Sequence, residues 1–174
     1  GVYRVNLVEK LLVPLLSKLS NLVIDGGIWM NTQRPEWNDA NNALVGQGVS
    51  MVTMNYLRRY TRFLTRLIPS DTEYALSIEV ADWLSETAAA LESVAAVVDG
   101  QHPVSDSQRF ELLEQLGRPA CRFRSEVYRQ EGFTGTRSVE SGEIHGLLSS
   151  ALVAIEHSIN TSRRFPVGIQ DLDY

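Results

Sequence analysis

A short polar segment, Glu36-Trp37-Asn38-Asp39, places a carboxyl group two residues after an indole, and carboxamides follow at Asn41 and Asn42. A carboxyl group that is partly buried beside a tryptophan keeps its proton more easily, because burial disfavours the charged form. Such a group can protonate a leaving sugar oxygen while the amides bond sugar hydroxyls. A second carboxyl group at Glu36 would favour the protonated form further. Asp39 is therefore the candidate general acid.

The same residues also have a purely structural interpretation. Asp and Asn often cap helices and form turns through hydrogen bonds between their side chains and the nearby backbone. Asp39 is followed by Gly46 and Gly48 just before a helical pattern begins. From residue types alone, a cap at Asp39 and turns at the asparagines are the commoner roles.

The order of residues in this segment resembles that of one family. Residues 36–42 read Glu-Trp-Asn-Asp-Ala-Asn-Asn, and the segment of the cellobiose phosphorylase family reads Asp-Trp-Asn-Asp-Gly-Met-Asn. The matching positions are Trp37, Asn38, Asp39 and Asn42, and the positions that differ are Glu36, Ala40 and Asn41. In that family the segment joins two helices of an α/α toroid of six helical hairpins, and its second aspartate is the general acid. Related toroidal glycoside hydrolases carry comparable loops.

The resemblance implies an inverting glycoside hydrolase or phosphorylase. Asp39 would be its general acid, and the residues that would shape the site or contact the sugar are Trp37, Asn38, Glu36 and Asn42. Trp29 would offer a further aromatic face, because indoles stack on the apolar face of sugar rings. The implied substrate is an oligosaccharide or glycoside, with phosphate as a possible second substrate and no cofactor. A ring of six hairpins needs more helices than this chain provides, so the resemblance also implies the remainder of a longer chain.

An inverting reaction needs a second participant, which is either a carboxylate that activates water or a bound phosphate. Three glutamates lie around a glycine-bearing loop at residues 132–135, namely Glu131, Glu140 and Glu143. Acidic residues at the start of a helix more often complement the helix dipole. We therefore expect these three to be structural.

Other residues that could do chemistry are less informative. Four tyrosines could line a sugar site, although half-buried tyrosines on helices are common; they are Tyr3, Tyr56, Tyr60 and Tyr128. The three histidines, His102, His145 and His157, show no metal-ligand spacing. We assign no metal site to them.

Apolar residues at steps of three and four predict a chain made of helices. We expect helices over residues 5–23, 49–68, 73–98 and 105–130, with a fifth that starts at Ser138 or Ser141. Pro14 predicts a kink or restart in the first helix, and Gly117 or Pro119 predicts a break in the fourth. Residues 25–48 read as a long loop. Apart from stretches too short to assign, nothing in the chain alternates as a strand should. The expected fold class is all-α, with antiparallel helical hairpins that form one domain over residues 1–174 or a fragment of an α/α toroid.

Composition limits the classes of partner. The chain has 16 basic and 21 acidic residues and a net charge of −5, which disfavours nucleic acid. One basic cluster at helical spacing reads as a solvated or ion-paired helix face; it consists of Arg58, Arg59, Arg62 and Arg66. No run is long and apolar enough to span a membrane, and no export signal precedes the first helix. The single cysteine, Cys121, agrees with a reducing compartment, so we expect a cytoplasmic protein.

Two hypotheses from different classes follow. The first is a carbohydrate-active enzyme, or the part of one that carries its general-acid loop. The second is a non-catalytic helical scaffold or protein-interaction module, in which the loop around Trp37 serves packing or partner binding. The concentration of asparagine, tryptophan and carboxylate in one loop favours the enzyme, because a scaffold does not need it.

Overall fold

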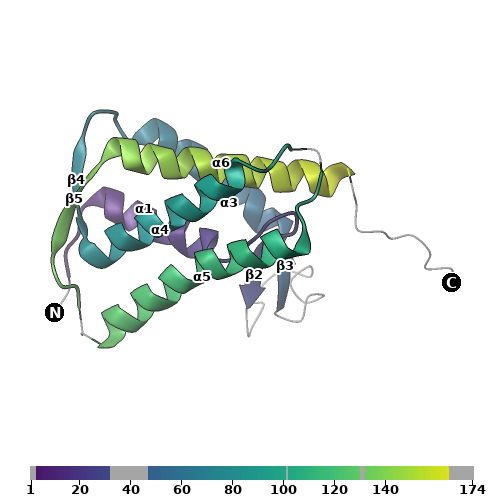
Figure 1. The fold of residues 1–174 in the computed structure, drawn as a ribbon. Helices are drawn as coiled ribbons and strands as arrows, with labels where there is room; N and C mark the ends of the chain where they lie inside the picture. The colour runs from purple at the N-terminus through teal and green to yellow at the C-terminus, as the bar shows by residue number, and fades with distance from the viewer. Residues whose placement is uncertain (1–2, 32–46, 101, 130–131, 165–174) are drawn as a thin grey trace, which may run out of the picture.

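The computed structural model describes residues 3–31, 47–100, 102–129 and 132–164. This part of the chain is mostly helical and contains a few short antiparallel strands. Figure 1 shows successive helices running in opposite directions, so that the connections between them alternate between two ends of the array. The all-α prediction is therefore right in its coarse form, and the closed toroid remains a prediction.

Five helices are present in the described residues, as expected. They are α1 (Leu7–Leu19), α3 (Met51–Leu67), α4 (Ile78–Ala95), α5 (Asp106–Arg129) and α6 (Ser141–Arg164). α1 continues through Pro14 without a restart, and α5 continues through Gly117 and Pro119 without the predicted break. A proline inside a helix costs about 3 kcal/mol. Here the neighbouring side chains are buried, Leu12 and Leu15 in α1 and Leu116 in α5, so tertiary packing offsets that cost.

The strands are short, and none of them was assigned from the sequence. One sheet contains β1 (Leu22–Val23), β2 (Gly27–Asn31) and β3 (Gln47–Ser50) in that order, all antiparallel. A separate antiparallel pair joins β4 (Glu73–Ser77) to β5 (Thr136–Glu140). The third helix therefore starts at Ile78 and not at residue 73. Strands of two to five residues are too short to show a clear alternation.

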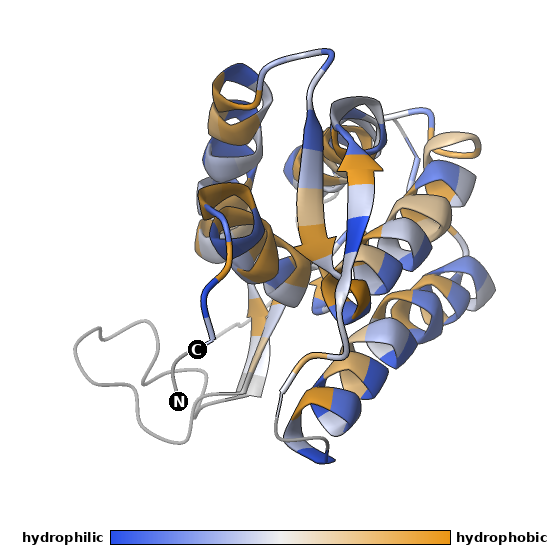
Figure 2. Ribbon diagram, turned by 90° about the vertical axis from the view of Figure 1, so that its left-hand side faces the viewer, coloured by the Kyte–Doolittle hydropathy of each residue, from blue (hydrophilic) through white to orange (hydrophobic). Residues whose placement is uncertain are grey.

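The two sheets lie at opposite ends of the helical array (Figure 1). We call the end with β1, β2 and β3 the hairpin end, and the other the β4–β5 end. Figure 2 looks onto the β4–β5 end, where β4 leads directly into α4 and β5 into α6. At the hairpin end, Gly27 lies so close to β3 that an added Cβ would be 3.1 Å from the carbonyl carbon of Ser50.

The core is formed by inward faces of all five helices. α4 lies between α5 and α6 and packs on both. Its Leu84 and Leu91 are buried together with Leu16 of α1 and Leu148 of α6. The ring of Trp83 stacks on Phe123 of α5 with centroids 4.7 Å apart. This continuous core fixes the positions of the two ends relative to each other.

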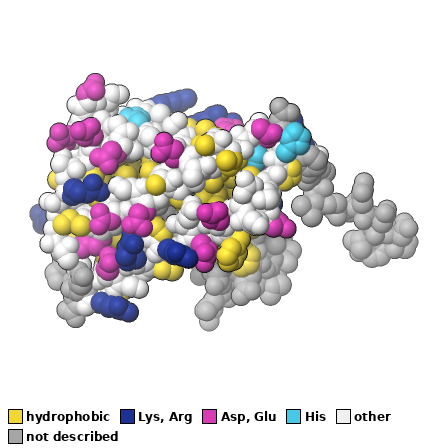
Figure 3. All heavy atoms as spheres, in the orientation of Figure 1, with side chains coloured by type: hydrophobic (Ala, Val, Ile, Leu, Met, Phe, Trp, Pro, Cys, Tyr) yellow, Lys and Arg dark blue, Asp and Glu magenta, His cyan; other side chains and the backbone are white. Residues whose placement is uncertain are grey.

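The surface carries charges of both signs. Figure 3 shows acidic and basic side chains interspersed over the face formed by α4, α5 and α6. The basic cluster of α3 is partly ion-paired, as predicted, because Glu156 of α6 lies 2.5 Å from Arg58 and 2.8 Å from Arg62. None of the helices in the described residues combines the length and the apolar character needed to cross a bilayer.

Candidate functional site

The segment that carries the predicted general acid is bounded by the paired strands β2 and β3. Five predicted site residues lie outside the described residues: Glu36, Trp37, Asn38, Asp39 and Asn42. Asn31 pairs with Gln47, which brings together the two ends of residues 32–46. β3 then leads into α3, whose N-cap Ser50 accepts a hydrogen bond from the Thr53 N–H at 3.1 Å. β2 and β3 therefore hold the two ends of residues 32–46 together, close to the start of α3.

Trp29 is the predicted site residue that the structure describes. It lies in β2 and not in a loop, so this part of the sequence interpretation was wrong. The alternation along β2 buries Ile28 in the core and leaves Trp29 45% exposed, opposite the exposed Val49 of β3. A half-exposed indole beside the ends of residues 32–46 is accessible for stacking on a sugar ring.

The turn before β2 is held by the buried carboxylate of Asp25, whose side chain is 8% exposed. One oxygen, Oδ2, accepts a hydrogen bond from the Val104 N–H at 2.8 Å and lies 3.5 Å from the Arg109 guanidinium. The other, Oδ1, accepts a hydrogen bond from the Thr161 hydroxyl at 2.9 Å. Because both oxygens are engaged, Asp25 is an anchor between this turn, α5 and α6, and not a candidate for activating water.

His157 of α6 completes the network around Asp25. Its Nδ1 accepts a hydrogen bond from the Gly100 N–H at 3.0 Å, which places the proton of a neutral ring on Nε2. Nε2 lies 3.0 Å from Asp25 Oδ1, although the N–H direction is not aligned well enough for a hydrogen bond. Within the described residues, no group of three or more His, Cys, Asp and Glu side chains could hold a metal ion.

The glutamates considered as a second catalytic group lie at the other end. Glu131 is outside the described residues. Glu143 accepts a hydrogen bond from the Glu140 N–H at 3.3 Å and so caps α6, as the structural interpretation predicted. α6 first reaches Asp25 at His157 and Ser158, about 21 to 23 Å further along the helix at 1.5 Å per residue. Glu140 and Glu143 therefore do not belong to the hairpin end.

The tyrosines do not converge on the hairpin. Tyr60 donates a hydrogen bond to the Leu11 carbonyl at 2.9 Å, and burial raises the pKa of its phenol. Tyr3 packs on Phe133 with ring centroids 4.6 Å apart. Tyr56 and Tyr128 are exposed on α3 and α5. The structural interpretation is confirmed for Tyr60, which joins α3 to α1.

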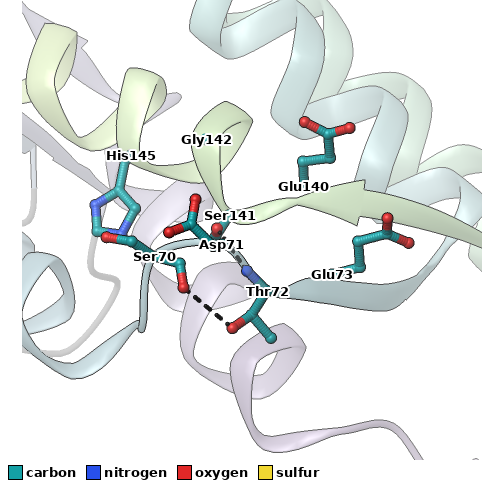
Figure 4. A pocket seen from close by; sticks show the side chains of 8 residues that line it. All are labelled: Ser70, Asp71, Thr72, Glu73, Glu140, Ser141, Gly142 and His145. Carbon is teal, nitrogen blue, oxygen red and sulfur yellow. Dashed lines mark hydrogen bonds between the residues drawn. The ribbon is translucent and has the colours of Figure 1, made fainter.

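A polar pocket of about 460 Å³ lies at the β4–β5 end, beside the first turn of α6. Figure 4 shows Glu73 and Glu140 projecting from neighbouring strands on one side and His145 on the other, with Asp71 between them. Among the lining residues, the Ser141 hydroxyl accepts a hydrogen bond from the Thr72 N–H at 3.1 Å. Three carboxylates, without lysine or arginine among the lining residues, disfavour an anionic ligand here.

Two buried glutamates hold the β4–β5 end together. Glu9 of α1 accepts hydrogen bonds from the N–H and the hydroxyl of Ser77, at 2.9 and 2.6 Å. Glu79 of α4 accepts from the N–H and the hydroxyl of Thr134, at 2.9 and 2.7 Å. Burial raises the pKa of Glu79, but the bonds from Thr134 and from its own backbone outweigh burial and bring the pKa below its ordinary value. Both carboxylates join segments that are distant in the sequence.

Comparison with known proteins does not assign the site. No protein-family model matches the chain, and no curated protein matches it. The functional hypothesis therefore depends on residues 36–42 and on the frame provided by β2 and β3. Sequence analysis missed the anchoring role of Asp25. The Asp25-Gly26-Gly27 turn marked its position, but nothing in the sequence indicated its partners.

Proposed function

We propose that this chain is part of an inverting carbohydrate-active enzyme of the α/α-toroid class, a glycoside hydrolase or phosphorylase, in which Asp39 is the general acid. The observation that carries the proposal is the pairing of Asn31 with Gln47 between α1 and α3. This pairing closes residues 32–46 at their base between two helices. The resembling family carries its general acid in a segment that also joins two helices. Helices of alternating direction agree with a ring of helical hairpins.

The proposed roles follow from residue chemistry. Asp39 would protonate the leaving oxygen, and the adjacent carboxyl group of Glu36 would favour its protonated form. Trp37 would stack on the sugar, and the exposed indole of Trp29 would provide a second aromatic surface. The amides of Asn38 and Asn42 would bond sugar hydroxyls.

The second participant of the reaction is proposed to come from outside the described helices. Asp25 has both oxygens engaged, and Glu140 and Glu143 lie at the other end of the array. A ring of six hairpins needs further helices, which the remainder of a longer chain would supply together with a water-activating carboxylate or a phosphate site. Product analysis distinguishes the two reactions, because only phosphorolysis requires phosphate and yields a sugar phosphate.

The test is Asp39→Asn in the full-length parent chain. The amide keeps the shape of the side chain but cannot donate the proton, so turnover of an unactivated glycoside should fall by about 10²- to 10⁴-fold. A substrate with an activated leaving group should be affected much less. Asp71→Asn is the matched control, because it makes the same change at an exposed position of the β4–β5 end.

The alternative outcome is that Asp39→Asn changes neither turnover nor stability. If Asp39 is a cap or a turn residue, asparagine replaces it with little effect, and both turnover and stability stay at the wild-type level. That result would remove Asp39 as the acid and favour the non-catalytic helical scaffold.

A further inference from the structure

The imidazole of His157 is buried in α6 with one nitrogen bonded and the other not. Its side chain is 1% exposed. Nδ1 accepts a hydrogen bond from the Gly100 N–H at 3.0 Å. Because a backbone N–H can only donate, this bond exists only while the ring is neutral with its proton on Nε2. That Nε2–H has no hydrogen-bond partner among the described residues, although Asp25 Oδ1 lies 3.0 Å away. The neutral ring thus satisfies Gly100 but not Asp25.

Protonation of the ring reverses this preference. A proton on Nδ1 would point at the Gly100 N–H, and because two donors cannot bond to each other, that hydrogen bond must break. The imidazolium is attracted to the Asp25 carboxylate. Once Gly100 no longer fixes the ring, it can turn to align Nε2–H with Oδ1. Each carboxylate oxygen would then face one cation, since the Arg109 guanidinium lies 3.5 Å from Oδ2. The two protonation states therefore favour two different partners of the same ring.

Asp25 Oδ1 can take this bond because its present donor has another acceptor. The Thr161 hydroxyl donates to Oδ1 at 2.9 Å, but its oxygen also lies 2.5 Å from the carbonyl oxygen of His157. A hydroxyl has one proton, so it can turn from the carboxylate to the carbonyl. The rearrangement therefore leaves the buried hydroxyl bonded while Oδ1 accepts from the imidazolium.

The other charged groups around the ring are engaged elsewhere. Glu156, the preceding residue of α6, lies 2.8 Å from Arg62 of α3. In the connection between α4 and α5, Asp99 Oδ2 lies 2.7 Å from His102 Nδ1. Among the described residues, α4 contributes no charged side chain to the cavity that the ring lines. Asp25 is the carboxylate that faces Nε2 directly, so protonation of the ring is tied to the turn before β2.

Gly100 is the point where this change would act on the chain. It lies between α4 and α5 with a φ of 71°, and an added Cβ would have no neighbour within 4 Å. Together with Val98 and Asp99 it lines a cavity of about 520 Å³, whose other lining residues lie mainly on α6 between Ser149 and Asn160. His157 belongs to the same lining. Loss of the Gly100 hydrogen bond would therefore release one wall of this cavity from α6.

We propose that His157 is a proton switch for the connection between α4 and α5. The neutral ring holds Gly100 against α6, and the protonated ring turns to Asp25 and releases Gly100. Histidine side chains change charge between about pH 5 and pH 8, a range in which aspartate and glutamate in ordinary surroundings stay largely ionised. The inference does not depend on the proposed enzymatic function, since none of these residues belongs to the general-acid segment.

A pH titration of the whole chain by nuclear magnetic resonance tests the switch. The ring nitrogens of His157 and the amide of Gly100 are followed from about pH 8 to about pH 5, and amides inside α4 and α6 report whether the fold persists. The Gly100 amide proton should shift upfield as its hydrogen bond breaks, with the same midpoint as the ring nitrogens. A ring that stays neutral throughout would overturn the proposal, as would a ring that becomes charged while the Gly100 amide keeps its shift.

Glutamine variants separate His157 from the other histidines. His157→Gln supplies an amide oxygen that can accept from the Gly100 N–H at any pH, so the Gly100 signal should no longer titrate. His102→Gln removes the histidine bonded to Asp99, next to Gly100, and should leave the titration unchanged. His145→Gln, near the start of α6, is a second control. Persistent titration in His157→Gln, or its loss in His102→Gln, would contradict the proposal. If His157→Gln does not fold, the wild-type titration and the His102→Gln result still decide.

Discussion

The two ends of the helical array connect helices in different ways. At the β4–β5 end, residues 68–77 join α3 to α4 and residues 130–140 join α5 to α6, and each connection ends in a five-residue strand that runs directly into the next helix. At the hairpin end, residues 20–50 lie between α1 and α3. Of the connections between the described helices, the longest therefore contains the candidate general acid, Asp39.

The proposed function assigns catalysis to a segment other than the pocket that carboxylates line. The β4–β5 end has a pocket of about 460 Å³ with three carboxylates around it, yet its connections are short. Long connections lose entropy on closure and are usually functional when a compact domain keeps them. At the hairpin end this closure is supported by β-pairing and by the Asp25 network.

The largest effect on stability is expected for Asp25→Ala. It removes a buried acceptor from the Val104 N–H, the Thr161 hydroxyl and the Arg109 guanidinium, and breaking such a buried charged network costs about 3 to 5 kcal/mol. Urea unfolding monitored by circular dichroism measures the loss.

Asp71→Ala is the matched control for Asp25→Ala. Both aspartates have positive φ, 63° and 59°, so both variants carry the same backbone penalty, but the Asp71 side chain is exposed. Equal destabilisation by the two variants would show that the Asp25 carboxylate contributes nothing beyond its backbone conformation. The contrast between the two ends would then be lost.

A smaller loss is expected for Gly27→Ala. The added Cβ would lie 3.1 Å from the carbonyl carbon of Ser50, so β2 and β3 would have to separate, at about 1 to 3 kcal/mol. Gly146→Ala, in α6 with open space at its Cβ, should be neutral or stabilising. Thermal unfolding of both variants measures these changes in stability. If Gly27→Ala is as stable as the wild type, the pairing of β2 with β3 tolerates a wider spacing.

Removal of the α3 cap should cost less again. Ser50→Ala deletes the acceptor of the Thr53 N–H, for about 1 kcal/mol. Ser105→Ala, which deletes the acceptor of the Gln108 N–H at the start of α5, is the benchmark. A loss at Ser50 clearly larger than at Ser105 would show that the hairpin pairing depends on this cap.

The smallest effect on stability at neutral pH is expected for Glu79→Gln. The Glu79 carboxylate instead changes how stability depends on pH. Because its pKa is lowered in the folded state, it stabilises the fold above about pH 4.3, the ordinary glutamate value, and this contribution is lost as the pH falls through the folded-state pKa. Glu79→Gln should therefore lose less stability than the wild type between neutral and acidic pH. Thr134→Val should act in the same direction, and unchanged acid unfolding in both would contradict the assignment.

The helices could be predicted because apolar residues repeat along them at helical spacing. The prediction of α6 succeeded because Ile144, Leu147, Leu148, Ala151 and Ile155 form one buried face. The strands could not be predicted, because two to five residues do not reveal an alternation. Glu73 was assigned to a helix for this reason, although its pairing with Glu140 on another strand is what defines it.

The candidate site could be predicted only as a set of residue types in one segment. Trp29 was placed in a loop because its β partner, Val49, is separated from it by residues without any regular pattern. The role of Asp25 could not be predicted, because its hydrogen-bond partners become neighbours only after the helices have packed.

The Asp25 network also has a consequence for the order of folding. Its hydrogen bonds to Ser158, Thr161 and Ser162 span 133, 136 and 137 residues of the chain. Contacts of such sequence separation form late, since local helices can close first. During synthesis at about 5 to 20 residues per second, these partners of Asp25 are translated roughly 7 to 27 s after Asp25 itself. A nascent chain thus completes the support of its long connection only when α6 is almost finished.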